Sequence, residues 1–242
     1  MDKKADSVSK LLLWLFVSFS VLVAGLMAYF LINDFCAFTL PNPDLAKFLV
    51  VCVTPLFPAA RLLTHAFAKK ENPRQLQDYL LLSALLLTAC SDFVLLFFEQ
   101  IAWIGLIPFT FAQLAHFVRL YVEAGKNKTH LIASFIAWGL ISGTAMALGL
   151  ALIEQSPLIV LASLYGGRLL LNLFESTLFA FMQRQWRFIL LCVGFALFVA
   201  CDVFVVLRYA NVTGAWRFIW VCYAPSQLLL AWSCHEPEKK RT

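Results

Sequence analysis

The chain has 242 residues, of which 62% are hydrophobic and only 14% are charged. Soluble domains are typically about a quarter charged, so this composition argues against a soluble enzyme and indicates an integral membrane protein. The formal net charge of +5 is explained by basic loops on one side of a membrane, and we expect no nucleic acid partner.

The apolar residues fall into eight segments, each about as long as a bilayer-spanning helix requires. These segments cover residues 11–32, 45–67, 79–98, 101–121, 130–152, 157–181, 187–209 and 214–234. Because the connections are short, consecutive helices are expected to pack antiparallel in one bundle. The sequence therefore predicts an all-α, polytopic membrane helix bundle of about eight transmembrane helices, which forms a single integral membrane domain over residues 1–242.

Basic residues gather at alternate ends of the predicted helices. They are Lys3, Lys4 and Lys10 before the first, Lys69, Lys70 and Arg74 after the second, Lys126 and Lys128 after the fourth, Arg184 and Arg187 after the sixth, and Lys239, Lys240 and Arg241 after the eighth. The opposite loops carry the acidic residues Asp34, Asp44, Glu99 and Glu154. Lysine and arginine favour the cytoplasmic side, so the pattern predicts that both termini are cytoplasmic.

Two aspartates interrupt the apolar segments in similar surroundings. Asp92 follows Ala-Cys-Ser in the third helix, and Asp202 follows Ala-Cys in the seventh. A charge at the centre of a membrane helix costs roughly 2.5–3.5 kcal/mol on insertion scales, and function is the usual reason for it. The two helices are four apart and run in the same direction, with each aspartate toward the outer side. This indicates a possible parallel repeat of four plus four helices, with both carboxylates near its axis.

Several other polar residues lie within the predicted helices. Those that we expect to bind substrate or support the site are Lys47 in the second helix, His116 in the fourth, Arg168 in the sixth, and Tyr223 and Gln227, one turn apart, in the eighth. A structural interpretation is also open, in which the aspartates pair with Arg168 and Lys47 only to fix helix packing.

The cysteines and the remaining polar residues have simpler expected roles. The seven cysteines are scattered without a Cys-x-x-Cys pair, so we expect small buried side chains and no metal site. Glu175, Arg61 and His65 lie nearer the cytoplasmic ends, where their side chains are expected to reach the membrane surface.

Two carboxylates in one low-dielectric pocket do not both ionise readily, so one is expected to hold a proton while the other does not. Such a pair supplies an acid and a base together, as hydrolases of acid-labile ethers and acetals require. The chain has no Gly-x-Ser-x-Gly, His-Glu-x-x-His or Walker loop that would indicate another hydrolase or nucleotide chemistry.

The order and spacing of these residues resemble the YhhN family of eight-helix membrane proteins, which includes the lysoplasmalogenases. The matching features are Lys47, Asp92, Gly105 with Phe109 and His116, the stretch 194–202 ending in Asp202, and Tyr223 with Gln227. The chain departs from the family pattern where Ser91, Cys201, Ser226, Arg119 and Phe48 replace glycine, serine, alanine, tyrosine and proline, respectively.

The resemblance implies hydrolysis of the vinyl ether bond of a lysoplasmalogen, a lysophospholipid, to a fatty aldehyde and a glycerophospho-alcohol. It implies that Asp92 and Asp202 are catalytic and that no cofactor is needed. The alternatives are a membrane transporter or lipid-binding protein that uses the aspartates as a proton or ligand site, and a relative that has no catalytic activity. The chain is expected to contact membrane lipids in every case.

Overall fold

The computed structural model describes residues 3–36, 41–67, 74–123, 125, 128–152 and 157–235. Seven of the residues used above for topology, Lys69, Lys70, Lys126, Glu154, Lys239, Lys240 and Arg241, lie outside this described part.

The described part is helical in every segment that was predicted to span. The helices are α1 (Lys3–Cys36), α2 (Pro43–Val53), α3 (Leu56–Phe67), α4 (Gln75–Phe97), the short 3₁₀ helix η1 (Glu99–Ile101), α5 (Ala102–Glu123), α6 (Lys128–Leu152), α7 (Pro157–Gln183), α8 (Trp186–Tyr209) and α9 (Ala215–Trp232). The prediction of an all-α polytopic bundle is confirmed, and the helix ends differ from the predicted ones by a few residues, apart from α1, which begins eight residues earlier.

The second predicted helix is divided into α2 and α3 by Thr54 and Pro55. Pro55 has no amide hydrogen with which to continue the helical ladder. The hydroxyl of Thr54 donates to the carbonyl of Val51 at 2.9 Å, which satisfies one acceptor at the break. Pro108 and Pro225, by contrast, lie inside the continuous helices α5 and α9.

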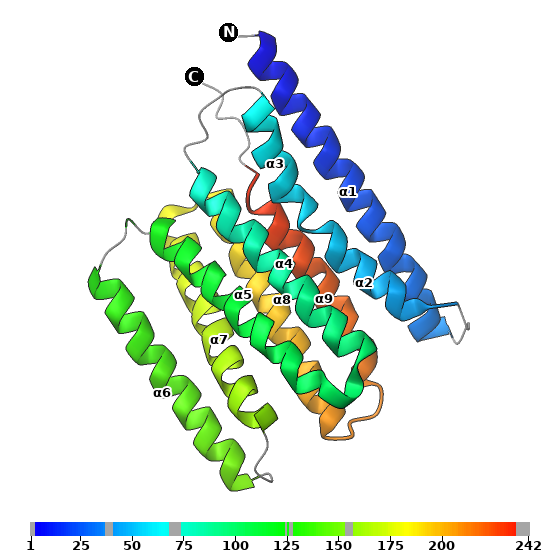
Figure 1. The fold of residues 1–242 in the computed structure, drawn as a ribbon, viewed down its shortest axis with the longest axis vertical. Coiled ribbons are helices and arrows are strands. Elements are labelled where there is room, and N and C mark those ends of the chain that lie inside the picture. The colour runs from blue at the N-terminus through cyan, green and yellow to red at the C-terminus, as the bar shows by residue number, and fades with distance from the viewer. Residues whose placement is uncertain are drawn as a thin grey trace.

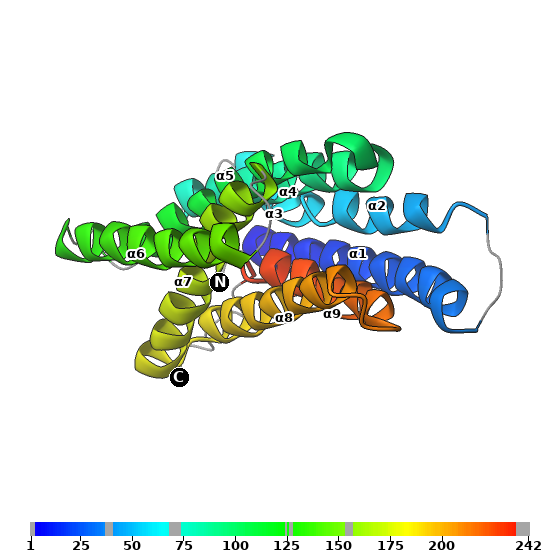
Figure 2. The ribbon, with the colours of Figure 1, turned by 90° about the horizontal axis from the view of Figure 1, so that it is seen from below.

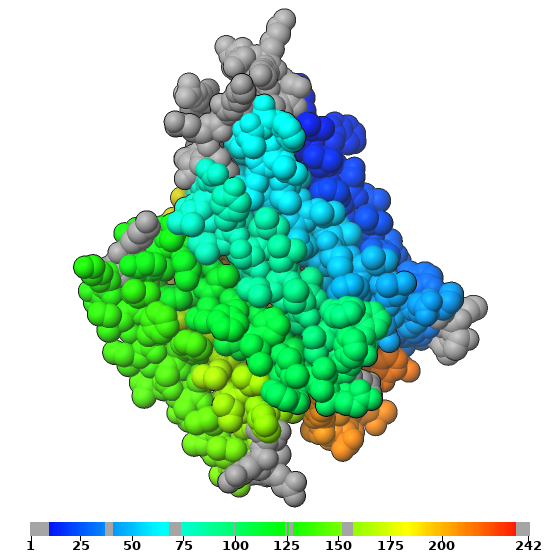
Figure 3. Space-filling view, viewed as in Figure 1, coloured from blue at the N-terminus to red at the C-terminus, as the bar shows by residue number. Residues whose placement is uncertain are grey.

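The helices form two layers. Figure 2 shows α2, α3, α4 and α5 in one layer and α1, α9 and α8 in the other, with α7 joining the layers at one edge and α6 outside it. The contacts agree, because α7 packs on both α5 and α8, whereas α6 packs mainly on α7. From the face shown in Figure 3, α2, α4 and α5 cover α9, of which only the beginning is visible.

Seven of the described helices are long and apolar enough to cross a membrane, with α2 and α3 counted as one. The remaining predicted span is α9, which has 18 residues. It contacts α8, α1, α2, α3 and α4 and therefore lies inside the bundle. A helix covered by other helices needs less apolar surface than one that faces lipid, which explains how α9 carries several polar side chains.

The start of α1 and the end of α9 lie on the same side of the bundle (Figure 1), as an even number of crossings requires. The contacts also follow the proposed repeat: α1 on α2, α2 and α3 on α4, and α4 on α5 in the first half correspond to α6 on α7, α7 on α8, and α8 on α9 in the second. The cross-contacts correspond too, since α5 packs on α7 as α9 packs on α2 and α3.

Candidate active site

Asp92 is buried between α4 and α9. Only 4% of the residue is exposed, and its Oδ2 accepts a hydrogen bond from the Tyr223 hydroxyl at 2.5 Å. Tyr223 is itself 4% exposed. The residue pair is 131 positions apart in sequence, so this hydrogen bond joins the two halves of the chain. On the α2 side, Cys52 lies close enough to interact electrostatically with Asp92.

Asp202 has an equivalent tyrosine partner, from a different helix. The hydroxyl of Tyr165, on α7, is hydrogen-bonded to the Asp202 carboxylate on α8. Tyr165 is buried, whereas Asp202 is partly exposed. Each aspartate is therefore oriented by one tyrosine hydroxyl, which donates to a carboxylate oxygen.

The two aspartate–tyrosine pairs belong to one group of side chains. Tyr165 interacts electrostatically with both Asp92 and Asp202, and so does Cys201, which is buried. We call Asp92, Asp202, Tyr165, Tyr223 and Cys201 the aspartate cluster. Its members come from α4, α7, α8 and α9.

Aromatic rings enclose the aspartate cluster. The ring of Phe198 packs on Tyr223 at 5.3 Å and on Tyr165 at 6.3 Å between centroids, so it contacts both tyrosines. Phe109 of α5 packs on Tyr165 at 5.3 Å. Phe198 and Phe109 are buried, and a low-dielectric surround of this kind strengthens the electrostatic interactions inside it.

Gln227, a predicted supporting residue, lies one turn beyond Tyr223 on α9 and is fully buried. Lys47 lies at the edge of the site. Its ammonium forms ion pairs with Asp34 at 3.5 Å and Asp44 at 3.3 Å. It also lies 6.0 Å from the ring centroid of Trp220, and that ring packs against Tyr223.

His116 is buried on α5, and its ring packs on α8 against a residue outside the aspartate cluster. The ring meets Phe195 edge-on at 5.2 Å, and His116 interacts electrostatically with Arg119, one turn further along α5. Arg119, which replaces the family tyrosine, donates to the hydroxyl and the carbonyl of Ser233 at 2.8 and 3.1 Å. Arg119 therefore ties α5 to the end of α9, away from the aspartate cluster.

Arg168 belongs to a second polar cluster, formed by α5, α6 and α7. Its guanidinium donates to Glu175 Oε1 at 2.9 Å, to Ser134 Oγ at 2.8 Å and to Asn172 Oδ1 at 3.1 Å. It also lies 4.0 Å above the ring of Phe117. The structure thus assigns Arg168 a carboxylate partner on its own helix, instead of a place beside the aspartates as expected.

The interpretation that the aspartates only neutralise Lys47 and Arg168 is therefore not supported, because both bases have other carboxylate partners. The expectation that Glu175 and Arg61 reach the membrane surface is wrong. Glu175 is 4% exposed and bound by Arg168, and Arg61 is 8% exposed and lies 3.2 Å from Asp78. Both side chains form ion pairs with buried groups of opposite charge, so neither needs to reach the membrane surface to be neutralised.

Tyr165 is the hydrogen-bond partner of Asp202 that the sequence did not single out. One signal was present, since a tyrosine in the middle of a membrane helix carries a hydroxyl that needs a hydrogen-bond partner. It sits three positions before Arg168 and seven before Asn172, on the polar side of α7. Nothing local, however, indicates that its partner is Asp202, because the pairing depends on how α7 packs on α8.

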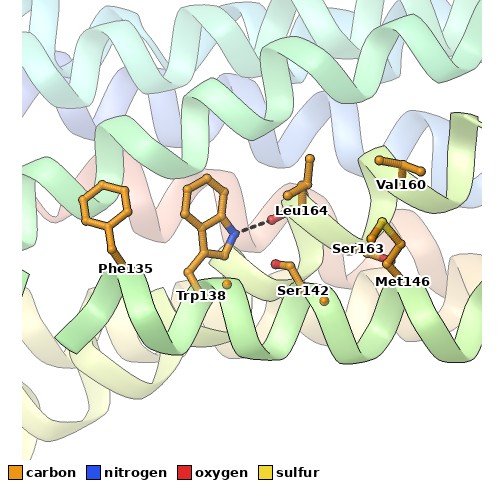
Figure 4. A pocket seen from close by; sticks show the side chains of 9 residues that line it. Phe135, Trp138, Ser142, Met146, Val160, Ser163 and Leu164 are labelled. Carbon is orange, nitrogen blue, oxygen red and sulfur yellow. Dashed lines mark hydrogen bonds between the residues drawn. The ribbon is translucent and has the colours of Figure 1, made fainter. Parts of the chain in front are cut away.

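A cavity of about 310 Å³ lies between α6 and α7, apart from the aspartate cluster. Figure 4 shows Trp138, Ser142 and Met146 of α6 facing Val160, Ser163 and Leu164 of α7 across it. Trp138 Nε1 donates to the Leu164 carbonyl at 2.8 Å. The lining is mostly apolar. Within the described part of the chain, including this cavity, no three His, Cys, Asp or Glu side chains are grouped as a metal site requires.

The departures from the family pattern are accommodated locally. The hydroxyl of Ser91 donates to the Leu87 carbonyl of its own helix at 3.1 Å, so α4 and α5 still pack closely. A Cβ at Gly105 of α5 would lie 3.1 Å from the Ser91 carbonyl oxygen and 3.0 Å from Leu95, closer than most Cβ contacts, which favours glycine there. Phe48 of α2 packs on Phe93 and Phe97 of α4.

Comparison with known proteins agrees with this arrangement. Searches of curated proteins and of solved structures found no match. The profile of the YhhN family matches residues 45–234, which run from within α2 to beyond the end of α9 and include every member of the aspartate cluster. A match over this much of the sequence, on a polytopic helical bundle, shows that the chain belongs to the YhhN family.

Proposed function

We propose that this protein is a lysoplasmalogenase-like hydrolase, which cleaves the vinyl ether bond of a lysophospholipid to a fatty aldehyde and a glycerophospho-alcohol. The observation that carries the proposal is the aspartate cluster, in which two intramembrane carboxylates share one group of neighbours and each accepts a hydrogen bond from a tyrosine. Membership of the YhhN family supports the same class of reaction.

The proposed reaction needs only an acid, a base and water. A carboxylic acid of the cluster gives its proton to the β-carbon of the vinyl ether, and the double-bond electrons form the new C–H bond. The product is an oxocarbenium ion, which the ionised carboxylate stabilises. Water adds to the cationic carbon and gives a proton to that carboxylate. The hemiacetal then collapses to the aldehyde as the glycerol oxygen leaves with a proton, so the net change is the addition of one water.

The surroundings fit this chemistry. The buried aromatic rings lower the dielectric around the tyrosines and Asp92, so a proton and a negative charge act there at close range. Asp202 is partly exposed, so the cluster has one carboxylate that a molecule entering between the helices can meet. A single-chain amphiphile within the bilayer reaches this depth without leaving the membrane.

The test is turnover of purified protein with lysophospholipids that differ only in having a vinyl ether, an alkyl ether or an ester at one carbon. We expect aldehyde from the vinyl ether alone. Asp92→Asn and Asp202→Asn should each lower the rate by about 10²–10⁴-fold, because an amide keeps the shape of the carboxyl but supplies neither the acidic proton nor the negative charge.

Asp78→Asn is the matched control. Asp78 is as buried as Asp92 and lies on the same helix, but its carboxylate is 3.2 Å from Arg61. We expect this variant to lower the melting temperature and to keep its turnover below that temperature. Near-normal aldehyde release by either Asp92→Asn or Asp202→Asn would reject the catalytic role of that residue.

A transporter or lipid-binding protein is the second candidate, favoured by the parallel repeat of helix contacts and by intramembrane carboxylates, both of which occur in carriers. The two candidates differ in a simple assay. Aldehyde formation in detergent, without any gradient, supports the hydrolase. Movement of an unchanged lipid across sealed vesicles that depends on a proton gradient supports the carrier.

We also propose that both termini are cytoplasmic, from the distribution of lysine and arginine. The outer half of the membrane would then contain the aspartate cluster, so the substrate would enter from the outer leaflet.

A further inference from the structure

Gln227 is a fully buried amide whose hydrogen-bonding groups the protein leaves free. Within the described part of the chain, neither its Oε1 nor its Nε2 has a hydrogen-bond partner, and the residue is 0% exposed. The hydroxyl of Ser226, also 0% exposed, has no partner there either. Buried polar groups are nearly always satisfied, and leaving them unpaired is costly, so these atoms point to a polar ligand.

These free groups adjoin the reacting centre. Gln227 is four residues after Tyr223 on α9, so the two side chains lie on one face about one turn apart. Tyr223 donates to Asp92. Pro225 adds a further acceptor, because it has no amide hydrogen to bond the carbonyl of Val221 one turn earlier. Anything bound by Gln227 is therefore next to the Tyr223–Asp92 pair.

The tight packing beside Gln227 favours a very small ligand. One turn beyond Gln227, α9 packs tightly on α8: a Cβ at Gly194 would lie 3.0 Å from Leu230 Cδ2 and 3.4 Å from its backbone nitrogen. On the α8 side, the buried ring of Phe198 packs on Tyr223. An amide that offers both donors and an acceptor in such a space matches water, which needs two to four polar partners.

We propose that Gln227 binds the water molecule that adds to the oxocarbenium ion. This inference rests on the proposed hydrolase function and gives it its second reactant. Ser226 is a second, dispensable contact to this water. The family pattern has alanine at that position, so the glutamine alone must be able to hold the water. Gln227 is accordingly a positioning residue for water. It takes no part in the protonation of carbon, which is left to the aspartate cluster.

The two steps can be separated in heavy water. Protonation by deuterium places one deuterium on the β-carbon. If water adds quickly, the ion goes on to aldehyde. If addition is slow, a carboxylate removes a hydrogen from the same carbon, the double bond forms again, and the recovered substrate carries deuterium. Loss of the bound water therefore appears as exchange that exceeds hydrolysis.

The variant is Gln227→Met, which has nearly the same length and no hydrogen-bonding groups. Because no protein hydrogen bond is lost, its melting temperature should stay close to that of the unmodified protein. With vinyl ether lysophospholipid in heavy water, aldehyde release should fall about 100-fold, while mass spectrometry of the recovered lipid should show deuterium that the unmodified protein does not introduce. Ser226→Ala should lose only a few-fold in rate.

Gln113→Met is the matched control. Gln113 is a fully buried glutamine of α5 that follows Phe109 by four positions, as Gln227 follows Tyr223. Its Oε1, however, accepts from Asn172 Nδ2 at 2.9 Å. We expect this variant to lose stability without changing the ratio of exchange to hydrolysis.

The possible results are distinct. Unchanged aldehyde release by Gln227→Met overturns the inference, and so does a loss of release without deuterium exchange. If that loss comes with a raised KM, the glutamine binds a hydroxyl group of the substrate instead of water. Absence of aldehyde with the unmodified protein would refute the proposed hydrolase itself, which the Gln227→Met result alone does not address.

Discussion

Replacing Arg168 should destabilise the protein strongly while leaving the chemistry of the aspartate cluster in place. In Arg168→Met the Glu175 carboxylate, 4% exposed, loses the guanidinium that lies 2.9 Å away. Breaking a buried ion pair by removing one partner costs about 3–5 kcal/mol, because an uncompensated charge stays behind. The hydrogen bonds to Ser134 and Asn172 contribute less, since intramembrane hydrogen bonds average about 0.6 kcal/mol each.

The assay is thermal unfolding in detergent together with turnover well below the transition. The double variant Arg168→Met, Glu175→Gln removes both charges, so it should recover most of the lost stability, leaving a deficit of about 1–2 kcal/mol. Turnover per folded molecule should remain near normal in both variants. If Arg168→Met kept its stability but lost its turnover, Arg168 would act at the aspartate cluster, and the assignment to the second polar cluster would be refuted.

Three further results are expected. Tyr165→Phe and Tyr223→Phe should each lower vinyl ether turnover about 10-fold or more with little change in folding, because each removes the hydroxyl that orients one carboxylate; a normal rate in either would show that its hydrogen bond is dispensable. Gly167→Val should destabilise by about 1–3 kcal/mol in thermal unfolding, since a Cβ there collides with Ser142 of α6, whereas Gly166→Val, with open space around it, should not. A reporter fused to the C-terminus should be active in the cytoplasm, and an external signal would overturn the topology.

The helical segments were predictable because the signal for them is local. An apolar run of about 20 residues is a property of neighbouring residues, and the bilayer permits little besides a helix for such a run. The end of each helix lies close to the end of an apolar segment, apart from the start of α1. The break between α2 and α3 was less predictable, since Pro55 interrupts its helix while Pro108 and Pro225 do not.

The aspartates could be recognised in the same way, because a carboxylate within an apolar run stands out whatever its partner. Asp92, Asp202 and Tyr223 were all identified from the sequence, and the structure brings them into one cluster with Tyr165. Arg168 shows the limit of the approach. Its polarity was evident, but the choice between Glu175 and an aspartate could not be made from residue types alone.

Partner choice was decided only by the tertiary structure. The hydrogen bond from Tyr223 to Asp92 spans 131 positions, and that from Arg168 to Ser134 spans 34. Such pairs form because α9 packs on α4 and α6 packs on α7. The hydropathy of a segment predicts that it enters the bilayer as a helix. It does not predict the neighbours of that helix, because most apolar side chains can face either lipid or another helix with a similar free energy. Helix order, and with it the partner of each buried polar group, is therefore a property of the whole bundle.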